Sequence, residues 1–287
     1  MKTFITVSRA WTGAIFLLII GSCSKDVGLS DGSYLNPTPP AQNAVDQWIM
    51  ENFTKPYNIE VVYRWKEALV QRERYLYPPT LDSVKPALNI VKKLWIEPYS
   101  SAADPYIVNR VAPRQIVLVG GVNNNLSGTK TLGVAEAGKR ITLFEVDLLV
   151  KADRESIAQF IHTIQHEYVH ILNQTKPFDE QSYGKITPEG YTAQWYNSPA
   201  NSTYLADGFI TAYARANERE DFAETASAML LRSRSEWDTL INRIDGPGKK
   251  KIKQKEQLVA EYYKNEYGID LYQLQEAVYQ ATLKLLQ

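Results

Sequence analysis

Apolar residues recur at helical spacing along a segment near the middle of the chain. Between residues 153 and 174 they fall three or four positions apart, so they share one face of a helix. This face carries Ile157, Ile161, Ile164, Tyr168 and Ile171. Asp153 precedes the pattern and is a good N-cap, because its short side chain accepts hydrogen bonds from the first helical turn. The pattern therefore predicts an amphipathic helix over residues 153–174 with one buried face.

Shorter patterns on either side predict both strands and helices. Strands are expected over residues 59–63 and 114–119, and a hairpin from residues 131–136 and 140–146. Stretches rich in Gly, Asn and Pro predict loops over residues 120–130 and 175–203. Helices are expected over residues 41–53, 81–95, 204–214, 217–232, 236–243, 251–267 and 270–286. Pro86 is expected in or near the first turn of its helix. The mixture predicts an α+β fold class with a helical C-terminal part.

Composition and charge narrow the class of protein. The chain has 287 residues, of which 44% are hydrophobic and 22% are charged, so it has enough apolar material for a substantial core. The 32 basic and 32 acidic residues balance, which argues against a nucleic-acid partner. Five lysines cluster at Lys249, Lys250, Lys251, Lys253 and Lys255. We interpret this cluster as the solvated start of a helix and not as a binding patch.

The N-terminus has the pattern of a secretory signal. Lys2 and Arg9 precede an apolar run over residues 14–20, which is too short to span a bilayer. Ile20-Gly21-Ser22-Cys23 follows and resembles the lipobox of bacterial lipoproteins, in which the signal is cut before a lipidated cysteine. The alternative is a plain cleaved signal with an incidental cysteine. We therefore predict a signal peptide over residues 1–22 and lipidation of Cys23, which anchors the protein to a membrane.

The lipobox also divides the chain and indicates a location. Residues 23–40 are rich in Gly, Ser, Asn and Pro, which predicts a flexible tether before a single domain over residues 41–287. Ser24-Lys25-Asp26 resembles the surface-export tag of Bacteroidetes-type lipoproteins. The expected location is the outer membrane with the domain exposed at the cell surface, and a domain facing the periplasm is the alternative.

One motif on the central helix carries chemistry. His166-Glu167-Tyr168-Val169-His170 is an H-E-x-x-H sequence. His166 and His170 lie one turn apart on the same helix face, so two imidazoles can hold one Zn²⁺ from the same side. Glu167 lies beside them and can act as general base toward a water on the metal, whose pKa zinc lowers to about 7. The alternative is a helix whose histidines are satisfied without a metal.

A catalytic zinc site needs a third protein ligand and leaves one position for water. His162, the remaining histidine, lies one turn earlier and about 6 Å along the helix axis, too far to share one metal with the other two. We interpret it as a partner of a ligand or as a packing residue. The acidic segment 217–224 offers Glu220 and Glu224 on one helix face, so one can bind zinc while the other hydrogen-bonds a ligand. The alternative is an ordinary acidic helix start.

The stretch 213–224 (Y-A-R-A-N-E-R-E-D-F-A-E) resembles the catalytic domain of anthrax lethal factor, which has a Tyr, then R-x-N-E-x-E, then F-A-E. The separation from the H-E-x-x-H is also similar, and the resemblance covers roughly residues 140–232. It implies that Glu220 is the third zinc ligand and that Glu224 orients a ligand. It also implies that Tyr213 stabilises the tetrahedral oxyanion or the leaving group.

With the lipobox included, the whole chain resembles the substrate-import-associated zinc metallohydrolase lipoproteins, which are linked to outer-membrane nutrient uptake. This resemblance implies a zincin-like fold, in which a mixed sheet has its edge strand along the cleft and the helix with the zinc ligands lies beneath. Residues 140–146 are expected to be that edge strand, and a bound peptide would pair with it. An outer-membrane import complex is the partner that the resemblance implies.

These features predict a zinc-dependent hydrolase, specifically a gluzincin-like metallopeptidase that cleaves peptide or protein substrates. A zinc amidase or deacetylase acting on cell-wall or glycan amides is an alternative, because the same water chemistry serves it. A substrate-binding lipoprotein without activity is another. Within the stretch 175–203, Tyr191, Trp195 and Tyr196 either line subsites or pack the loop against the domain.

Overall fold

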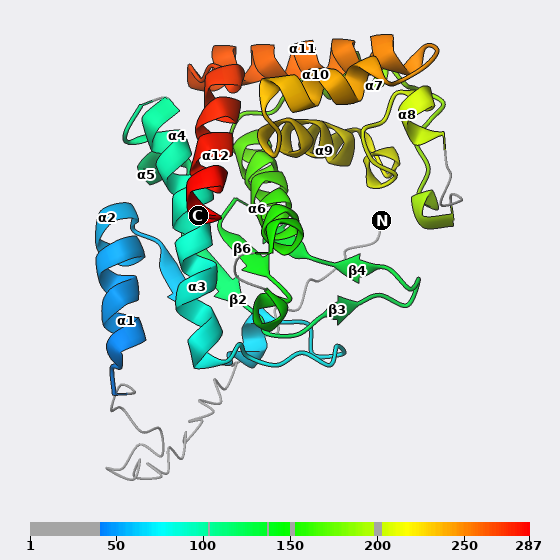
Figure 1. Ribbon diagram of the computed structural model, residues 1–287. Helices are drawn as coiled ribbons and strands as arrows, with labels where there is room; N and C mark the ends of the chain where they lie inside the picture. Colours follow the sequence, from blue (N-terminus) through cyan, green and yellow to red (C-terminus); the bar gives the residue numbers. More distant parts are fainter. Residues whose placement is uncertain (1–40, 103, 137, 150–152, 198–202) are drawn as a thin grey trace, which may run out of the picture. The chain divides into compact units, whose positions relative to one another are not determined.

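The computed structural model describes residues 41–102, 104–136, 138–149, 153–197 and 203–287 (Figure 1). The predicted signal peptide over residues 1–22, the lipidation site Cys23 and the tether over residues 23–40 lie outside this part of the chain. One compact unit covers Gln42–Gln287. Within the described ranges, no helix combines the length and the apolar character needed to cross a membrane.

The core of this unit contains a four-stranded mixed sheet with the strand order β1-β2-β6-β5. Its strands are β1 (Glu60–Val62), β2 (Gln115–Leu118), β5 (Gly133–Glu136) and β6 (Arg140–Leu143). The strands β1, β2 and β6 are parallel, and β5 is antiparallel to β6. Side chains alternate between the two faces, so Ile116 and Leu118 join the main core while Val117 packs in a smaller cluster with Leu69 and Leu76. The sheet is therefore covered on both faces.

The strands at the two edges of the sheet are β1 and β5, so the prediction that residues 140–146 form the edge strand is wrong. β6 pairs with β2 on one side and with β5 on the other, because the first arm of the hairpin takes the outer position. The strand also ends at Leu143, before the 3₁₀ turn η4 (Val146–Leu148). The predicted loop 120–130 contains a further short strand, because β3 (Asn123–Asn124) pairs with β4 (Lys130–Thr131).

The N-terminal helices pack around one side of this sheet (Figure 1). The helix predicted over residues 41–53 is observed as a continuous helical run through α1 (Ala44–Ile49), η1 (Met50–Thr54) and α2 (Lys55–Tyr57). The helix predicted over residues 81–95 extends further, through α3 (Leu81–Val91), η3 (Lys92–Ile96) and α4 (Glu97–Ala102). Pro86 lies inside α3, just after its first turn. Two short elements complete this part, η2 (Glu67–Leu69) and α5 (Ile107–Val111).

The central helix α6 (Arg154–Thr175) lies between the sheet and the C-terminal helices (Figure 1). It begins as predicted, with the Asp153 carboxylate accepting hydrogen bonds from the amides of Glu155 and Ser156. Helix α9 (Glu218–Leu230) packs along it, and this pairing joins the two parts of the molecule. The remaining C-terminal helices are α10 (Arg234–Asn242), α11 (Gly248–Tyr267) and α12 (Leu271–Leu285). The α+β fold class with a helical C-terminal part is confirmed.

Between α6 and α9, the described residues 176–197 and 203–217 form only short turns of helix. These are α7 (Glu180–Gly184), η5 (Trp195–Asn197), α8 (Tyr204–Asp207) and η6 (Tyr213–Arg215). The helix predicted over residues 204–214 is therefore wrong beyond Asp207. Gly208 has a φ of 101°, which ends α8, and a Cβ there would lie 2.6 Å from the Cβ of Lys251. Because only glycine fits this crossing, the chain turns there and buries Phe209 and Ile210.

Candidate metal centre

The two histidines of the H-E-x-x-H sequence face the same point in space. His166 and His170 lie one turn apart on α6, and their Nε2 atoms are 3.0 Å apart. His166 is 5% exposed, and it lies on the part of the helix that packs against α9. The helical spacing read from the sequence thus places two imidazole nitrogens within reach of one metal ion.

Helix α9 brings Glu220 to the same point. The Asn217 side chain caps this helix by accepting hydrogen bonds from the amides of Arg219 and Glu220, each at 3.0 Å, which fixes the first turn. The Oε2 atom of Glu220 lies 2.9 Å from His166 Nε2 and 3.2 Å from His170 Nε2. Burial raises the pKa of the Glu220 carboxyl, but the hydrogen bonds from His166 and His170 outweigh it and hold this pKa well below its usual range.

These three atoms form a group that suits a metal ion. Zinc bonds to nitrogen and oxygen are about 2.0–2.2 Å long, so the ligand atoms of one tetrahedral site lie roughly 3.3 Å apart. The observed separations of 2.9–3.2 Å are slightly shorter than this value. Two imidazoles and one carboxylate are also a donor set found in catalytic zinc sites, where the fourth position stays open. The residues therefore fit zinc.

Glu224, one turn beyond Glu220, contacts the other side of the His166 ring. Its Oε1 atom lies 2.7 Å from His166 Nδ1 and 2.8 Å from His162 Nε2, and its Oε2 atom accepts a 2.6 Å hydrogen bond from the Thr211 hydroxyl. Burial raises the Glu224 pKa, but His162 and His166 hold it well below its usual range. The Glu224 carboxylate thus lies against Nδ1 of His166, while Nε2 faces Glu220 and His170.

His162 and Glu224 also form, with His166, a second group of potential metal ligands in the described part of the chain. It shares His166 with the first group, and it uses the contacts to Glu224 just described. We interpret this second group as the support of the first one. His162 therefore has the supporting position that the sequence left open, and Thr211 is a partner that no sequence signal identified.

Glu167 lies on the side of α6 that faces strand β5. It is 7% exposed, and burial raises its pKa although the neighbouring His166 and His170 lower it. The strand passes very close here, since a Cβ on Gly133 would lie 2.9 Å from the Cγ of Glu167 and 2.6 Å from the Cγ2 of Thr163. Gly133 therefore allows the edge strand to lie directly against the carboxylate that the motif identifies as the base.

Tyr213 reaches the site from the short turn η6. Its ring centroid lies 5.8 Å from that of His166 and 4.9 Å from that of Trp195, which packs edge-on against it. Burial raises the pKa of the Tyr213 phenol far above its usual value, and the negative charge of Glu220 raises it further. The phenol is therefore protonated and able to donate a hydrogen bond at neutral pH.

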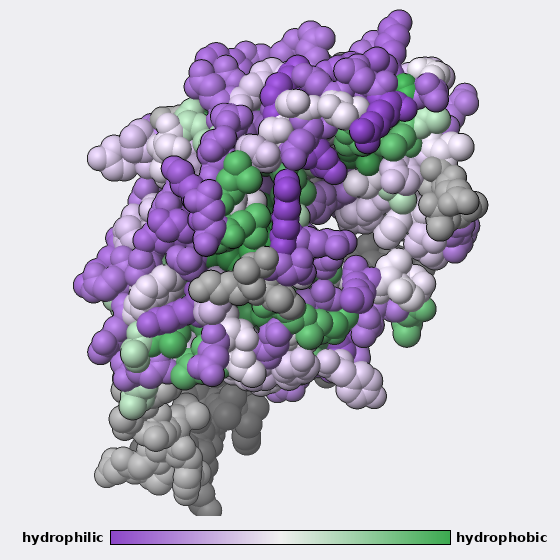
Figure 2. Space-filling view, viewed as in Figure 1, coloured by the Kyte–Doolittle hydropathy of each residue, from purple (hydrophilic) through white to green (hydrophobic). Residues whose placement is uncertain are grey.

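A cleft of about 300 Å³ opens above these groups. Its walls come from residues 129–133 on one side and from α6, Trp195 and Tyr213 on the other. Figure 2 shows a hollow on the face of the molecule between the region of β4 and the helices around α9. Trp195 thus lines the cleft, whereas Tyr191 packs inward with its hydroxyl donating a 2.9 Å hydrogen bond to Asp221. Of the two alternatives for the aromatic residues of this stretch, lining the cleft applies to Trp195 and packing against the domain applies to Tyr191.

A buried ion pair joins α11 to α9 next to Glu220. Lys255 on α11 has an exposed fraction of 0%, and its Nζ lies 2.5 Å from Asp221 Oδ2 and 2.8 Å from the Gly208 carbonyl oxygen. Burial raises the pKa of Asp221 to about 6, against the effect of Lys255. The interpretation of the lysine cluster as wholly solvated is therefore wrong for Lys255. Lys255 lies on the buried face of α11 with Ile252 and Val259. The spacing of these residues in the sequence could have indicated that Lys255 is buried.

Comparison with known proteins gives a family and a similar solved structure. A solved structure of "a putative zinc-binding metallo-peptidase" from Bacteroides caccae ATCC 43185 is similar, with a TM-score of 0.68 and 28% sequence identity, over 84% of this chain and 92% of that one. No match was found among curated proteins. Residues 38–272 match the profile of a family described as "Putative zinc-binding metallo-peptidase". Because this match spans most of the chain, including every residue of the site, the protein belongs to that family of zinc-binding metallo-peptidases.

Proposed function

We propose that the protein is a zinc-dependent peptidase of the gluzincin type, with His166, His170 and Glu220 as the zinc ligands. The observation that carries this proposal is the convergence of their three ligand atoms, within 3.2 Å of one another, beside the buried Glu167. Zinc held there would polarise a peptide carbonyl and acidify a water molecule, which is the chemistry that peptide hydrolysis needs.

The residues around the proposed ligands have separate roles in catalysis. Glu167 accepts the proton of the attacking water and passes it to the leaving amine, because its carboxylate lies next to the ligands and under the edge strand. Tyr213 donates a hydrogen bond to the carbonyl oxygen as negative charge develops there, since its phenol stays protonated. Glu224 holds His166 in the orientation that presents Nε2.

The substrate is proposed to be an extended peptide. The free edge of β5 lies beside the cleft, and an added strand at this edge would bring its backbone over Glu167. In this arrangement the peptide is held by main-chain hydrogen bonds, and side-chain pockets along the cleft decide which sequences are cleaved.

The N-terminal sequence supports a proposed location. The lipobox-like run that ends at Cys23 supports a lipid anchor in the outer membrane, with the domain outside the cell and close to a nutrient import complex. Metabolic labelling with a radioactive fatty acid tests this. Label in the parent protein and none in Cys23→Ser is the expected result, and label in both would contradict the anchor.

The proposed activity is tested by zinc content and peptide-library cleavage, measured on the mature protein and on Glu167→Gln. We expect one zinc per chain in both proteins and cleavage only by the parent. Tyr213→Phe should bind zinc normally and lose mainly kcat, because the donated hydrogen bond is made in the transition state. One zinc without cleavage of any peptide would favour an amidase, a deacetylase or a binding protein, and a panel of amidated glycans would then distinguish them. Absence of zinc would contradict the proposal.

A further inference from the structure

A second, smaller cavity adjoins the cleft. It has a volume of about 180 Å³ and shares Lys130, Leu132 and Thr163 with the larger cleft as wall residues. Thr163 lies on α6 one turn before Glu167, so this shared wall is adjacent to the proposed base. Pockets for whole ligands usually measure about 300–1,000 Å³. A cavity of this size and position suits one side chain of a peptide held in the cleft.

The residues that line this cavity include both apolar and charged side chains. Phe144 and Phe160 form apolar walls and are 5% and 7% exposed. Ser156, Gln159 and Thr163 add neutral polar groups, and the acidic group of the lining is the Glu145 carboxylate, whose side chain is only 13% exposed. Gln159 donates a 3.4 Å hydrogen bond to its Oε2 atom. The cavity thus combines two aromatic rings that an aliphatic stem could pack against with polar side chains and one largely buried negative charge.

Glu145 has a backbone conformation that is energetically unfavourable for glutamate. Its φ is 60°, in the left-handed region that residues other than Gly, Asn and Asp rarely adopt. Its amide donates to the Gly121 carbonyl and its carbonyl accepts from the Leu148 amide, each at 2.9 Å, which locks this turn. Residues held in such conformations cluster at functional sites. The backbone that carries this side chain is therefore fixed before a ligand binds.

The existing partner of Glu145 is easily displaced. Lys130 Nζ lies 3.1 Å from Glu145 Oε1, but the Lys130 side chain is 53% exposed and reaches the cavity from its rim. An exposed lysine that leaves such a pair is resolvated by water at little cost. The buried carboxylate has no such alternative and needs a cation in its place. An acidic side chain would be repelled by Glu145, so the arrangement favours a basic one.

We propose that this cavity is a specificity pocket for an arginine or lysine side chain of the peptide substrate, which replaces Lys130 as the partner of Glu145. The inference rests on the proposed peptidase function and names the substrate that this site prefers. A peptide that pairs antiparallel with β5 runs from the Glu136 end toward the Lys130 end. Since Lys130 and Leu132 precede Gly133, which lies over Glu167, the pocket receives a residue on the C-terminal side of the cleaved bond.

The test compares peptides that differ only at this position, carrying arginine, lysine, norleucine or glutamate. The parent protein should cleave the basic peptides with the highest kcat/KM. Glu145→Gln keeps the size of the side chain and should lower kcat/KM for basic peptides on the order of 10- to 100-fold, with little change for norleucine. Lys130→Met removes the competing cation and should leave the basic preference intact or increase it.

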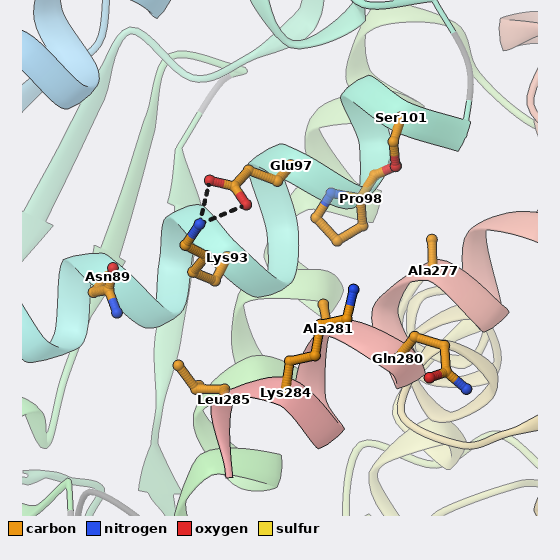
Figure 3. Close-up of a pocket in the computed structure, with 10 residues that line it drawn as sticks. All are labelled: Asn89, Lys93, Glu97, Pro98, Ser101, Ala277, Gln280, Ala281, Lys284 and Leu285. Atoms are coloured by element: carbon orange, nitrogen blue, oxygen red, sulfur yellow. Dashed lines mark hydrogen bonds and ion pairs between the residues drawn. The ribbon is translucent and has the colours of Figure 1, made fainter. Parts of the chain in front are cut away.

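A matched control exists in a pocket far from the metal ligands along the chain. Figure 3 shows a cavity between α3, η3, α4 and α12, where Lys93 and Glu97 form an ion pair with an N–O distance of 3.0 Å. Glu97→Gln removes a similar pair and should leave the peptide preference unchanged. This variant controls for the general effect of losing a surface charge on the protein.

The results separate this inference from the proposed function. Cleavage without a basic preference, or an equal loss for all peptides in Glu145→Gln, would overturn the specificity pocket and leave the peptidase intact. Binding of the same peptides to Glu167→Gln, measured by calorimetry, reports on the pocket without turnover. Tighter binding of basic peptides that is lost when Glu145→Gln is added supports the pocket. Equal affinity for basic and neutral peptides overturns the inference, whether or not the parent cleaves them.

Discussion

His166 Nδ1 lies 2.7 Å from the Oε1 atom of Glu224, on the opposite side of the ring from the Nε2 atom that faces Glu220 and His170. The same Oε1 atom also lies 2.8 Å from His162 Nε2. One buried carboxylate therefore contacts both His162 and the proposed zinc ligand His166. This relationship joins α6 to α9 at the point where the proposed metal site is assembled.

Replacing Glu224 should weaken zinc binding without unfolding the protein. Glu224→Gln keeps the shape but removes the charge that fixes the His166 tautomer, so zinc affinity should fall about 10- to 100-fold. Competition with a fluorescent zinc chelator measures this change. Glu218→Gln, on the same helix but packed near Gly184, is the control and should keep the parent affinity. Equal affinities in the two variants would show that Glu224 does not act through His166.

The close approach of β5 to α6 predicts that a larger residue at position 133 harms activity. Gly133→Ala places a methyl group 2.6 Å from Thr163 Cγ2 and 2.9 Å from Glu167 Cγ, so the strand or the base must shift. We expect a loss of about 1–3 kcal/mol in the free energy of unfolding. The accompanying fall in kcat/KM should be on the order of 10- to 100-fold. Urea unfolding and peptide cleavage measure the two effects.

A companion variant checks the cause of this effect. Gly133→Ala/Thr163→Ser removes one of the two clashing groups, and it should recover part of the lost stability. If the double variant is no more stable than Gly133→Ala, the clash with Thr163 is not the source of the strain.

Removing the cation from the buried ion pair should destabilise the domain strongly. Lys255→Met leaves the Asp221 carboxylate, which is 0% exposed, without its partner, and such losses cost about 3–5 kcal/mol. The free energy of unfolding in urea measures this loss. Lys255→Met/Asp221→Asn removes both charges and should be more stable than the single variant. A single variant as stable as the parent would mean that the pair is not ionised in the folded protein.

The lowered pKa of Asp46 predicts that part of the free energy of unfolding is lost in acid. Its carboxylate accepts two 2.7 Å hydrogen bonds from Arg64, and these, against some opposition from burial, lower its pKa to about 2. The ordinary pKa is 3.8, so the folded state binds this proton more weakly than the unfolded state. The stabilisation is therefore present above pH 3.8 and is lost as the pH falls toward 2. Solvent screening limits it to about 1 kcal/mol.

The difference in unfolding free energy between the parent and Asp46→Asn isolates this component, because other titrating groups cancel. The difference should be constant between pH 7 and about pH 5 and should shrink as the pH falls below the ordinary pKa of 3.8. A difference that stays constant down to pH 3 would contradict the assignment of the shifted pKa to the Arg64 contact.

The sequence by itself determined the features that depend on neighbouring residues. The spacing of apolar residues identified α6, and Asp153 identified its first residue, because helix periodicity and capping are local. The same spacing put His166 and His170 one turn apart and Glu220 and Glu224 one turn apart, which is all that a helix needs to present paired ligands. Gly208 ends α8 locally with its positive φ, yet the close approach to Lys251 that excludes a side chain there involves a residue far along the chain.

Only the tertiary structure decided how these pairs meet. More than 50 residues separate Glu220 from His166 in the sequence, and no local rule says whether Glu220 or Glu224 faces Nε2. The packing of α9 on α6 settles it, because Glu220 lies beside Nε2 and Glu224 beside Nδ1. In the same way, the pairing of β6 with two strands made β5 the edge, and the packing of α11 under α9 buried Lys255. Contacts between distant segments are chosen by the fit of whole surfaces, and a pattern within one segment does not contain that information.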